Sequence, residues 1–109
     1  MRILQVTPSL ANAGAERFLV DISNELLKTG NSVTIISLVG SYDKFTLSNE
    51  IDDRIRLIFL QKPNGFSFGV FIKLNNLIRN GQYDIIHTHT RALNYVSPFN
   101  LLNSRFKFI

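Results

Sequence analysis

The sequence contains no cysteine, so the chain can form neither a disulfide nor a thiolate metal site. That absence suits a reducing compartment. The sequence also has no run near the roughly eighteen consecutive apolar residues that a membrane span needs. Met1 leads directly into a strand-like segment instead of a charged and then apolar signal peptide. We therefore expect a cytoplasmic protein.

The common glycine-rich nucleotide motifs are missing as well. No G-x-G-x-x-G follows the first apolar segment, and no G-x-x-x-x-G-K-[ST] occurs, which argues against a typical dinucleotide site and a P-loop. That first segment ends in Gln5, Val6 and Thr7, not in acids. The sequence therefore lacks the carboxylates that would bind magnesium there in a phospho-receiver domain.

What remains is the composition of one globular domain. The chain has 109 residues, of which 45% are hydrophobic and 18% charged, and this length is enough for a single core. Twelve lysines and arginines against eight acids give a net charge of +4. The basic residues are scattered except for Arg105 and Lys107, so they predict no nucleic-acid site. They indicate either ordinary solvated faces or a weak preference for an anionic membrane surface or a phosphorylated substrate.

Strand-like and helix-like segments alternate along the chain. Short apolar, β-branched runs predict the strands, and periodic apolar residues bounded by Ser67, Gly30 or Gly81 predict the helices. Pro98 either kinks the last predicted helix or places its start after Ser97. The predicted strands are Arg2–Val6, Ser32–Leu38, Arg54–Leu60, Tyr83–His87 and a final one from Arg105; the predicted helices are Ala15–Thr29, Phe68–Asn80 and Ala92–Asn103, with one or two further helical turns between Val39 and Asp53.

Each of the first two predicted helices has an apolar stripe that should face the core. The residues of these stripes are Ala15, Phe18, Leu19, Ile22 and Leu26 in the first helix, and Phe68, Phe71, Ile72, Leu74 and Ile78 in the second.

This alternation predicts an α/β fold, a Rossmann-like open parallel sheet in the order 3-2-1-4-5 with helices on both faces. In that order the chain reverses direction between the first and fourth strands. Ligands bind in the crevice outside the carboxyl ends of those two strands. The segments around Gly14 and His87 should flank this crevice.

Gly14 stands just before the first predicted helix. Glycine lets the backbone approach a ligand closely, and the free N–H groups of a helix start favour a phosphate or sulfate. Alternatively, Gly14 only eases the turn, and Glu16 is an ordinary first-turn acid that the helix dipole favours.

His87 and His89 lie two residues apart at the end of the fourth predicted strand, so their side chains should point the same way. Two imidazoles without a nearby acid or cysteine make an incomplete metal site, so we expect no metal. Together with Thr88, Thr90 and Arg91 they can instead donate hydrogen bonds to hydroxyls or phosphate oxygens. His87, the histidine nearer the sheet, is as well suited to a structural role as to a binding role.

The opening segment, RILQVTPSLANAGAERFLVDISNELLKTGNSVTIISL, and the later YDIIHTHT together resemble the N-terminal domain of family-4-type retaining glycosyltransferases of the GT-B fold. The resemblance covers essentially the whole chain. It rests on the order and spacing of the first strand, the G-A-E-R entry into the helix, the closing Gly30 and the D-I-I-H-x-H strand end.

The resemblance implies half of a two-domain enzyme. In such enzymes two Rossmann-like domains face each other across a cleft and transfer a sugar from a nucleotide-sugar, with retention and without an obligatory metal. It implies that residues 1–109 are the acceptor-side domain, with a glycan or lipid-linked acceptor, in cell-surface polysaccharide synthesis. Ala13, Gly14 and Ala15 would face the donor diphosphate, whereas Glu16, His87, His89 and Arg91 would bind the acceptor. Peripheral association with the inner face of the membrane is also expected.

The chain departs from the family pattern in two respects. The family commonly has two glycines before the helix, whereas this chain has Ala13 and then Gly14. The donor-binding domain, with its paired glutamates, and a histidine after the fifth strand would lie beyond Ile109. Since one wall of the site cannot stabilise the leaving phosphate, we expect residues 1–109 alone to be inactive, with the second domain as their natural partner.

Two other classes of function stay open. The same crevice could bind a small anion without any chemistry. Alternatively, the domain could be a protein-interaction module that uses an exposed strand edge with Phe106 and Phe108.

Overall fold

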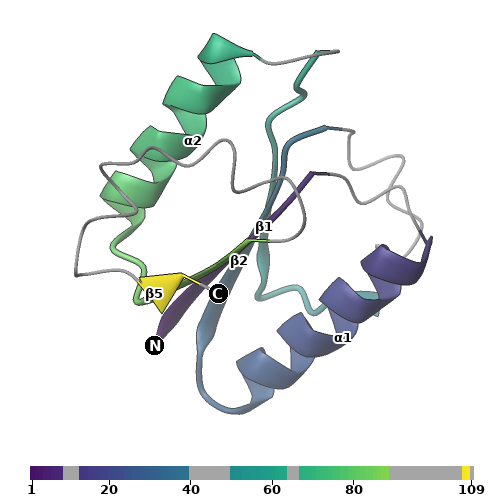
Figure 1. Ribbon diagram of the computed structural model, residues 1–109. Helices are drawn as coiled ribbons and strands as arrows, with labels where there is room; N and C mark the ends of the chain where they lie inside the picture. Colours follow the sequence, from purple (N-terminus) through teal and green to yellow (C-terminus); the bar gives the residue numbers. More distant parts are fainter. Residues whose placement is uncertain (9–12, 40–49, 64–66, 89–106, 109) are drawn as a thin grey trace.

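The computed structural model describes residues 1–8, 13–39, 50–63, 67–88 and 107–108, without the side chains of residues 13–16 and 107–108. These ranges contain the strands and helices of one α/β unit (Figure 1). Their bounds are β1 Arg2–Thr7, α1 Ala13–Lys28, β2 Ser32–Ser37, β3 Arg56–Phe59, α2 Phe68–Gly81, β4 Ile85–Thr88 and β5 Lys107–Phe108.

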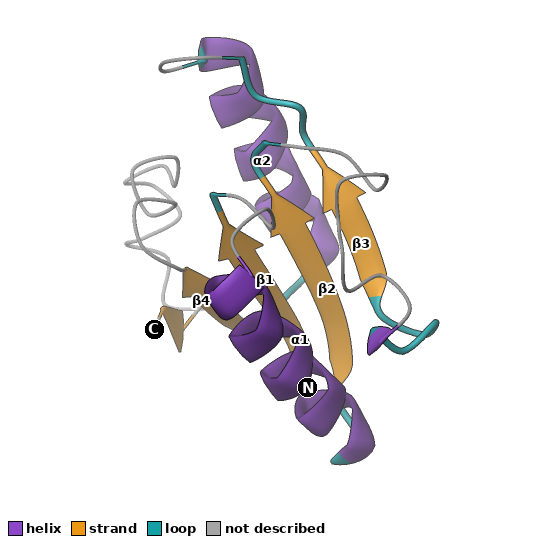
Figure 2. Ribbon diagram, turned by 90° about the vertical axis from the view of Figure 1, so that its right-hand side faces the viewer, coloured by secondary structure: helices purple, strands orange, loops and turns teal. Residues whose placement is uncertain are grey.

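The strands form one parallel sheet in the order β3-β2-β1-β4-β5. β1 lies at its centre, where Val6 is the register partner of both Ile36 in β2 and Thr88 in β4. α1 and α2 cover opposite faces of the sheet (Figures 1 and 2). The predicted Rossmann-like order and the two-sided covering are therefore confirmed.

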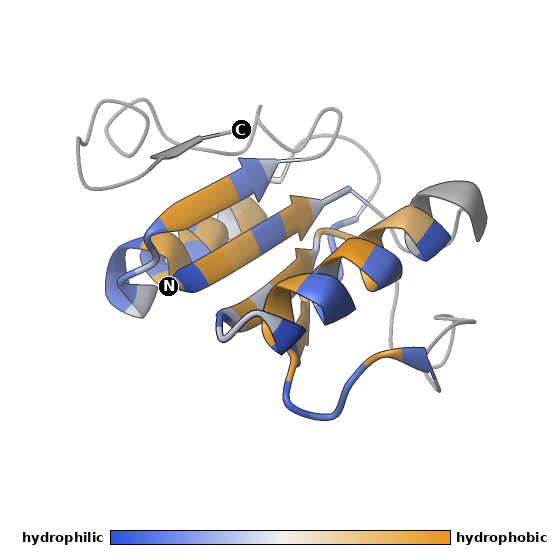
Figure 3. Ribbon diagram, turned by 90° about the horizontal axis from the view of Figure 1, so that it is seen from below, coloured by the Kyte–Doolittle hydropathy of each residue, from blue (hydrophilic) through white to orange (hydrophobic). Residues whose placement is uncertain are grey.

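The strands alternate their side chains between two cores, one under each helix. The core of the α1 layer consists of Leu19, Val20, Val33, Ile35 and Ile55. In the described ranges the core of the α2 layer has more members, which are Leu4, Val6, Ile36, Leu38, Leu60, Val70, Leu74, Ile78, Tyr83 and Ile86. Figure 3 shows hydrophobic residues concentrated in the strands, and polar residues alternating with hydrophobic ones along α1.

α1 begins at Ala13, two residues earlier than predicted, and its carboxyl end is closed by a hydrogen-bonded cap. The N–H of Gly30 donates to the carbonyl of Leu27 at 3.1 Å, and that of Asn31 donates to the carbonyl of Leu26 at 3.3 Å. Gly30 has a φ of 89°, which glycine adopts without strain. Together these bonds form a Schellman motif, so Gly30 terminates the helix as predicted.

The predicted core stripe of α1 is wrong at Phe18, whose side chain is 57% exposed. The residues that face the sheet are centred on Ser23, which is fully buried. At about 100° per residue, Phe18 points roughly 140° away from Ser23. The periodicity locates an apolar stripe, but the packing of the helix against the sheet decides which edge of that stripe is covered.

α2 begins as predicted, because Ser67 is its N-cap and the Ser67 Oγ accepts a hydrogen bond from the Val70 N–H at 3.3 Å. Its end differs in detail, since Gly81 is the last helical residue and Gln82 takes the left-handed conformation. Gly81 is needed for another reason: a Cβ there would overlap the ring of Tyr83.

The predicted core stripe of α2 is wrong at two positions. Phe68 is 73% exposed and Ile72 is 54% exposed, whereas Val70 and Leu74 face the sheet. The sheet covers only one side of this helix, which has seven apolar residues larger than alanine: Phe68, Val70, Phe71, Ile72, Leu74, Leu77 and Ile78. The remaining apolar side chains therefore stay in contact with solvent.

The other strand predictions agree with the structure to within two residues at most ends. β3 is shorter than predicted because residues 52–55 form a turn, in which the Ile55 N–H donates to the Asp52 carbonyl at 3.0 Å. β5 lies within the segment predicted from Arg105 and pairs with β4. The predicted helix over 92–103, with Pro98, and most of the segment between Val39 and Asp53 lie outside the described residues.

Candidate functional site

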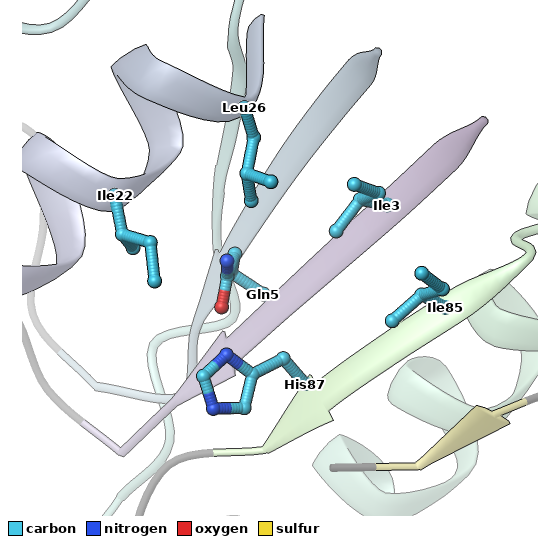
Figure 4. A pocket seen from close by; sticks show the side chains of 6 residues that line it. All are labelled: Ile3, Gln5, Ile22, Leu26, Ile85 and His87. Carbon is cyan, nitrogen blue, oxygen red and sulfur yellow. The ribbon is translucent and has the colours of Figure 1, made fainter. Parts of the chain in front are cut away.

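The carboxyl ends of β1 and β4 lie side by side, at the point where the strand order reverses direction. Gln5 is the register partner of His87, and Val6 is that of Thr88. α1 runs back along the sheet from this edge, with its first turn near the strand ends (Figures 1 and 4). The edge predicted to bind ligands is therefore built from β1, β4 and the start of α1.

An open cavity of about 260 Å³ lies between α1 and the two strands (Figure 4). Ile22 and Leu26 project into it from α1, whereas Ile3 and Ile85 form its floor. Its polar groups are the amide of Gln5 and the imidazole of His87, which lie beside one another toward the carboxyl edge. The cavity thus combines an apolar body with hydrogen-bonding groups at one end, which is the usual make-up of a small-molecule site.

His87 is half-buried, and the burial lowers its pKa below the ordinary value of 6.5, because desolvation disfavours the charged imidazolium. Near neutral pH the ring is therefore neutral, with one nitrogen that donates and one that accepts. A neutral imidazole beside an amide suits a hydroxyl-bearing ligand better than it suits an anion.

The predicted donor-side residues form the first turn of α1. Ala13, Gly14 and Ala15 are helical, so Gly14 belongs to the helix and not to the preceding loop. The first N–H groups of any helix lack partners within it, and here they belong to these residues. Their role toward phosphate, and that of Glu16 in the same turn toward an acceptor, stay predictions. His89 and Arg91 lie outside the described residues.

Gln5 is a site residue that sequence reasoning missed. Its side chain is only 1% exposed, although it lies in the central strand and lines the cavity. The sequence contains a sign of this role, because Gln5 is a polar residue between apolar residues of the strand. Burying an amide is costly unless hydrogen bonds satisfy it, which sets Gln5 apart from the apolar residues on either side of it in β1.

Arg17, the last residue of the G-A-E-R segment, has a structural contact of its own. Its guanidinium forms two hydrogen bonds with the carboxylate of Glu50, at 2.9 and 2.8 Å. These bonds lower the pKa of Glu50. Asn24 donates to the Glu50 carbonyl at 2.8 Å and accepts from the Asp52 N–H at 3.0 Å. These contacts attach residues 50–52 to α1.

Neither a metal cluster nor a membrane span appears in the ranges given above. Within them, no three His, Asp or Glu side chains are placed to hold a metal ion. The helices of this part of the chain are too short and too polar to cross a bilayer.

The parallel order, the helices on both faces and the ligand edge at the strand reversal define a Rossmann-like domain. The sequence model of Glycosyltransferase Family 4 matches residues 12–108. The chain belongs to Glycosyltransferase Family 4.

Two solved structures contain a domain that is similar to this chain. A glycosyltransferase from Rickettsia africae ESF-5 superposes with a TM-score of 0.69 and 29% identity, over 98% of this chain and 28% of that one. Apo UGT2 from Phytolacca americana has a TM-score of 0.56 and 18% identity over 81% of this chain and 24% of that one, which shows the fold alone. The chain thus spans about 28% of the length of the Rickettsia protein. A comparison with curated protein sequences finds no match.

Proposed function

We propose that this chain is the acceptor-side domain of a retaining glycosyltransferase of the GT-B type. It acts with a second domain that holds a nucleotide-sugar, and transfers the sugar to a glycan or lipid-linked acceptor in cell-surface polysaccharide synthesis. The observation that carries the proposal is the family match over residues 12–108, combined with an open cavity beside the strand reversal. No metal is required.

In this proposal His87 and Gln5 bind acceptor hydroxyls. The neutral imidazole and the buried amide lie together at the polar end of the cavity, whereas Ile22, Leu26 and Ile3 offer apolar contact to a sugar ring or a lipid-linked group. The N–H groups of Ala13, Gly14 and Ala15 receive the donor diphosphate, because a helix start favours an anion. The residues that stabilise the leaving group belong to the second domain, so residues 1–109 alone are inactive.

Amide chemical shifts of the ¹⁵N-labelled chain test this assignment. Titration with acceptor sugars should perturb Gln5 and His87, and titration with a nucleoside diphosphate should perturb residues 13–15. His87→Leu should weaken acceptor binding about fivefold, the typical effect of one lost hydrogen bond, because leucine can neither donate nor accept. Lys28→Ala, at the far end of α1, is the matched control and should leave binding unchanged.

Three outcomes would contradict the proposal. Sugar transfer by residues 1–109 alone would show that no second domain is needed. Tight saturable binding of a small anion, with no response to any sugar, would favour a non-catalytic binding module. Binding of neither ligand, combined with capture of a partner chain, would favour an interaction domain.

A further inference from the structure

Gln5 and His87 project from neighbouring strands onto the same face of the sheet. They are register partners in the parallel pair of β1 and β4, and partners of that kind point the same way. Figure 4 shows the amide oxygen of Gln5 turned toward the imidazole of His87. The ring nitrogen on that side is Nδ1, whereas Nε2 lies on the far side of the ring, toward the carboxyl ends of the strands (Figure 4). The two nitrogens of one ring therefore have different surroundings.

The lining around this pair is otherwise apolar. The other described residues that line the cavity offer neither a charge nor a side-chain hydrogen-bonding group; they are Ile3, Ile22, Leu26 and Ile85. The side chain of Gln5 is only 1% exposed, so little of it is open to direct contact with a ligand. Within that lining, the ring of His87 is the polar group on which the Gln5 amide can act.

A neutral imidazole carries a single ring proton, on either Nδ1 or Nε2. Burial lowers the pKa of His87, so its ring is neutral near neutral pH. The hydrogen bond made by one nitrogen decides which of the two carries the proton. An oxygen beside Nδ1 favours the proton there and leaves Nε2 as an acceptor, whereas a histidine side chain in water prefers the proton on Nε2.

We propose that Gln5 is a positioning residue, which keeps the proton of His87 on Nδ1 so that Nε2 accepts a hydrogen bond from a hydroxyl of the acceptor. Gln5 thus contributes to acceptor binding through the ring of His87. Glutamine suits this role because its oxygen accepts a hydrogen bond without bringing a negative charge, so the ring stays neutral. The role rests on the proposed function for its ligand, but the position of the ring proton is measurable without any sugar.

The position of Nε2 gives the ring proton its importance. Nε2 faces the ligand edge, where the strand order reverses. A hydroxyl that donates its hydrogen to Nε2 keeps both oxygen lone pairs free to face the donor sugar. If the proton were on Nε2, the ring would donate to the hydroxyl and occupy one of those lone pairs.

Two-bond ¹H–¹⁵N correlation spectra of the imidazole rings measure the tautomer directly, because protonated and bare ring nitrogens differ widely in ¹⁵N chemical shift. The chain has two histidines, and the signals that disappear in His87→Leu belong to His87. At about pH 8, where the ring is neutral, His87 of the natural chain should carry its proton on Nδ1. Gln5→Met has nearly the same shape but no amide, so it should move most of the proton to Nε2.

Gln5→Glu tests the same contact with a stronger acceptor. The proton should stay on Nδ1, and the pKa of His87 should rise, because a neighbouring carboxylate favours the imidazolium.

Thr34→Val is the matched control. Thr34 is buried and pairs with Leu4, which belongs to the core of the α2 layer, so it lies on the opposite face of the sheet. The substitution removes a buried polar group and should leave the tautomer of His87 unchanged. Circular dichroism identifies any variant that fails to fold, and the spectrum of the natural chain needs no variant for its tautomer.

Gln5→Met should also weaken acceptor binding. If the required tautomer falls to about one fifth of the population, the apparent Kd for an acceptor sugar rises about fivefold.

The proposal is overturned if His87 of the natural chain carries its proton on Nε2, or if Gln5→Met leaves it on Nδ1. An equal change of tautomer in Thr34→Val would also overturn it, because packing of the sheet would then explain the effect. Loss of the Nδ1–H form in Gln5→Met and its retention in Gln5→Glu support the role of Gln5. The same result without a response to any sugar would contradict only the proposed function. Sugar binding with an unchanged tautomer would keep the proposed function and overturn the role of Gln5.

Discussion

The two faces of the sheet are built differently, although one strand order supports both. Among the described residues, the α2 face has a core of ten buried members, Tyr83 included, and Ser67 caps the helix that covers it. In the same described ranges the α1 face has five such residues, a cavity lined by Gln5 and His87, and a buried Ser23 hydroxyl. We infer that the α2 face mainly contributes stability. The α1 face is less densely packed and places polar groups near the ligand edge.

The largest expected effect comes from replacing one leucine in each layer by alanine, which tests whether the two layers differ in packing. Leu74 is fully buried in the α2 layer, so Leu74→Ala should lower the free energy of unfolding by about 2–5 kcal/mol. Leu26 already borders a cavity, so Leu26→Ala should cost roughly half as much. Urea unfolding of both variants measures the difference.

Equal costs for the two truncations would remove the distinction between a closed and an open layer. If Leu74→Ala is too destabilised to measure, Ile78→Val is a milder test in the same core, with an expected cost of about 1 kcal/mol.

Ser23→Ala tests the packing of the α1 layer. The Ser23 Oγ is buried and has no hydrogen-bond partner in the part of the chain that the structure describes. Alanine removes the cost of this hydroxyl and has the higher helix propensity, so stability should rise by about 0.5–1 kcal/mol. Thermal unfolding followed by circular dichroism measures the change. A loss of stability on substitution would show that the hydroxyl has a partner.

The pH dependence of stability tests the environment of His87 and should give the smallest effect. Burial lowers the pKa of His87 in the folded chain, so the unfolded chain binds its proton more readily. The contribution of the uncharged His87 ring to stability is fully present above about pH 6.5. It decreases as the pH falls through that value toward the pKa of His87 in the folded chain.

Urea midpoints at pH 7.5 and 5.5 provide the measurement. The natural chain should lose more stability between these values than His87→Gln does. An equal loss in both proteins would mean that solvent reaches His87 freely.

Much of the fold follows from local patterns in the sequence. The apolar run of Ser32–Leu38, the Ser67 N-cap and the Gly30 stop each predict an element that the structure contains, and strand–helix alternation predicts the sheet order. Predictions of which side of each helix faces the core were less reliable. Phe18, Phe68 and Ile72 are apolar residues at helical spacing, yet they are exposed because each helix has a single covered side.

The site could be predicted only in outline. The end of β4 is singled out by its histidine, and family resemblance adds the start of α1. Gln5 was missed because its importance depends on His87, its register partner on the adjacent strand β4, which is remote in sequence. The contact between Arg17 and Glu50 is equally remote, and neither residue predicts the other.

The sequence by itself determined the alternating strands and helices, their caps and the parallel order, because these depend on backbone preferences and on burying apolar runs. Only the tertiary structure decided which side of each helix is covered, that Gln5 and His87 share a cavity, and that Arg17 of α1 pairs with Glu50. Such features arise from the parallel crossovers, which bring distant residues together and fix the direction in which each side chain points.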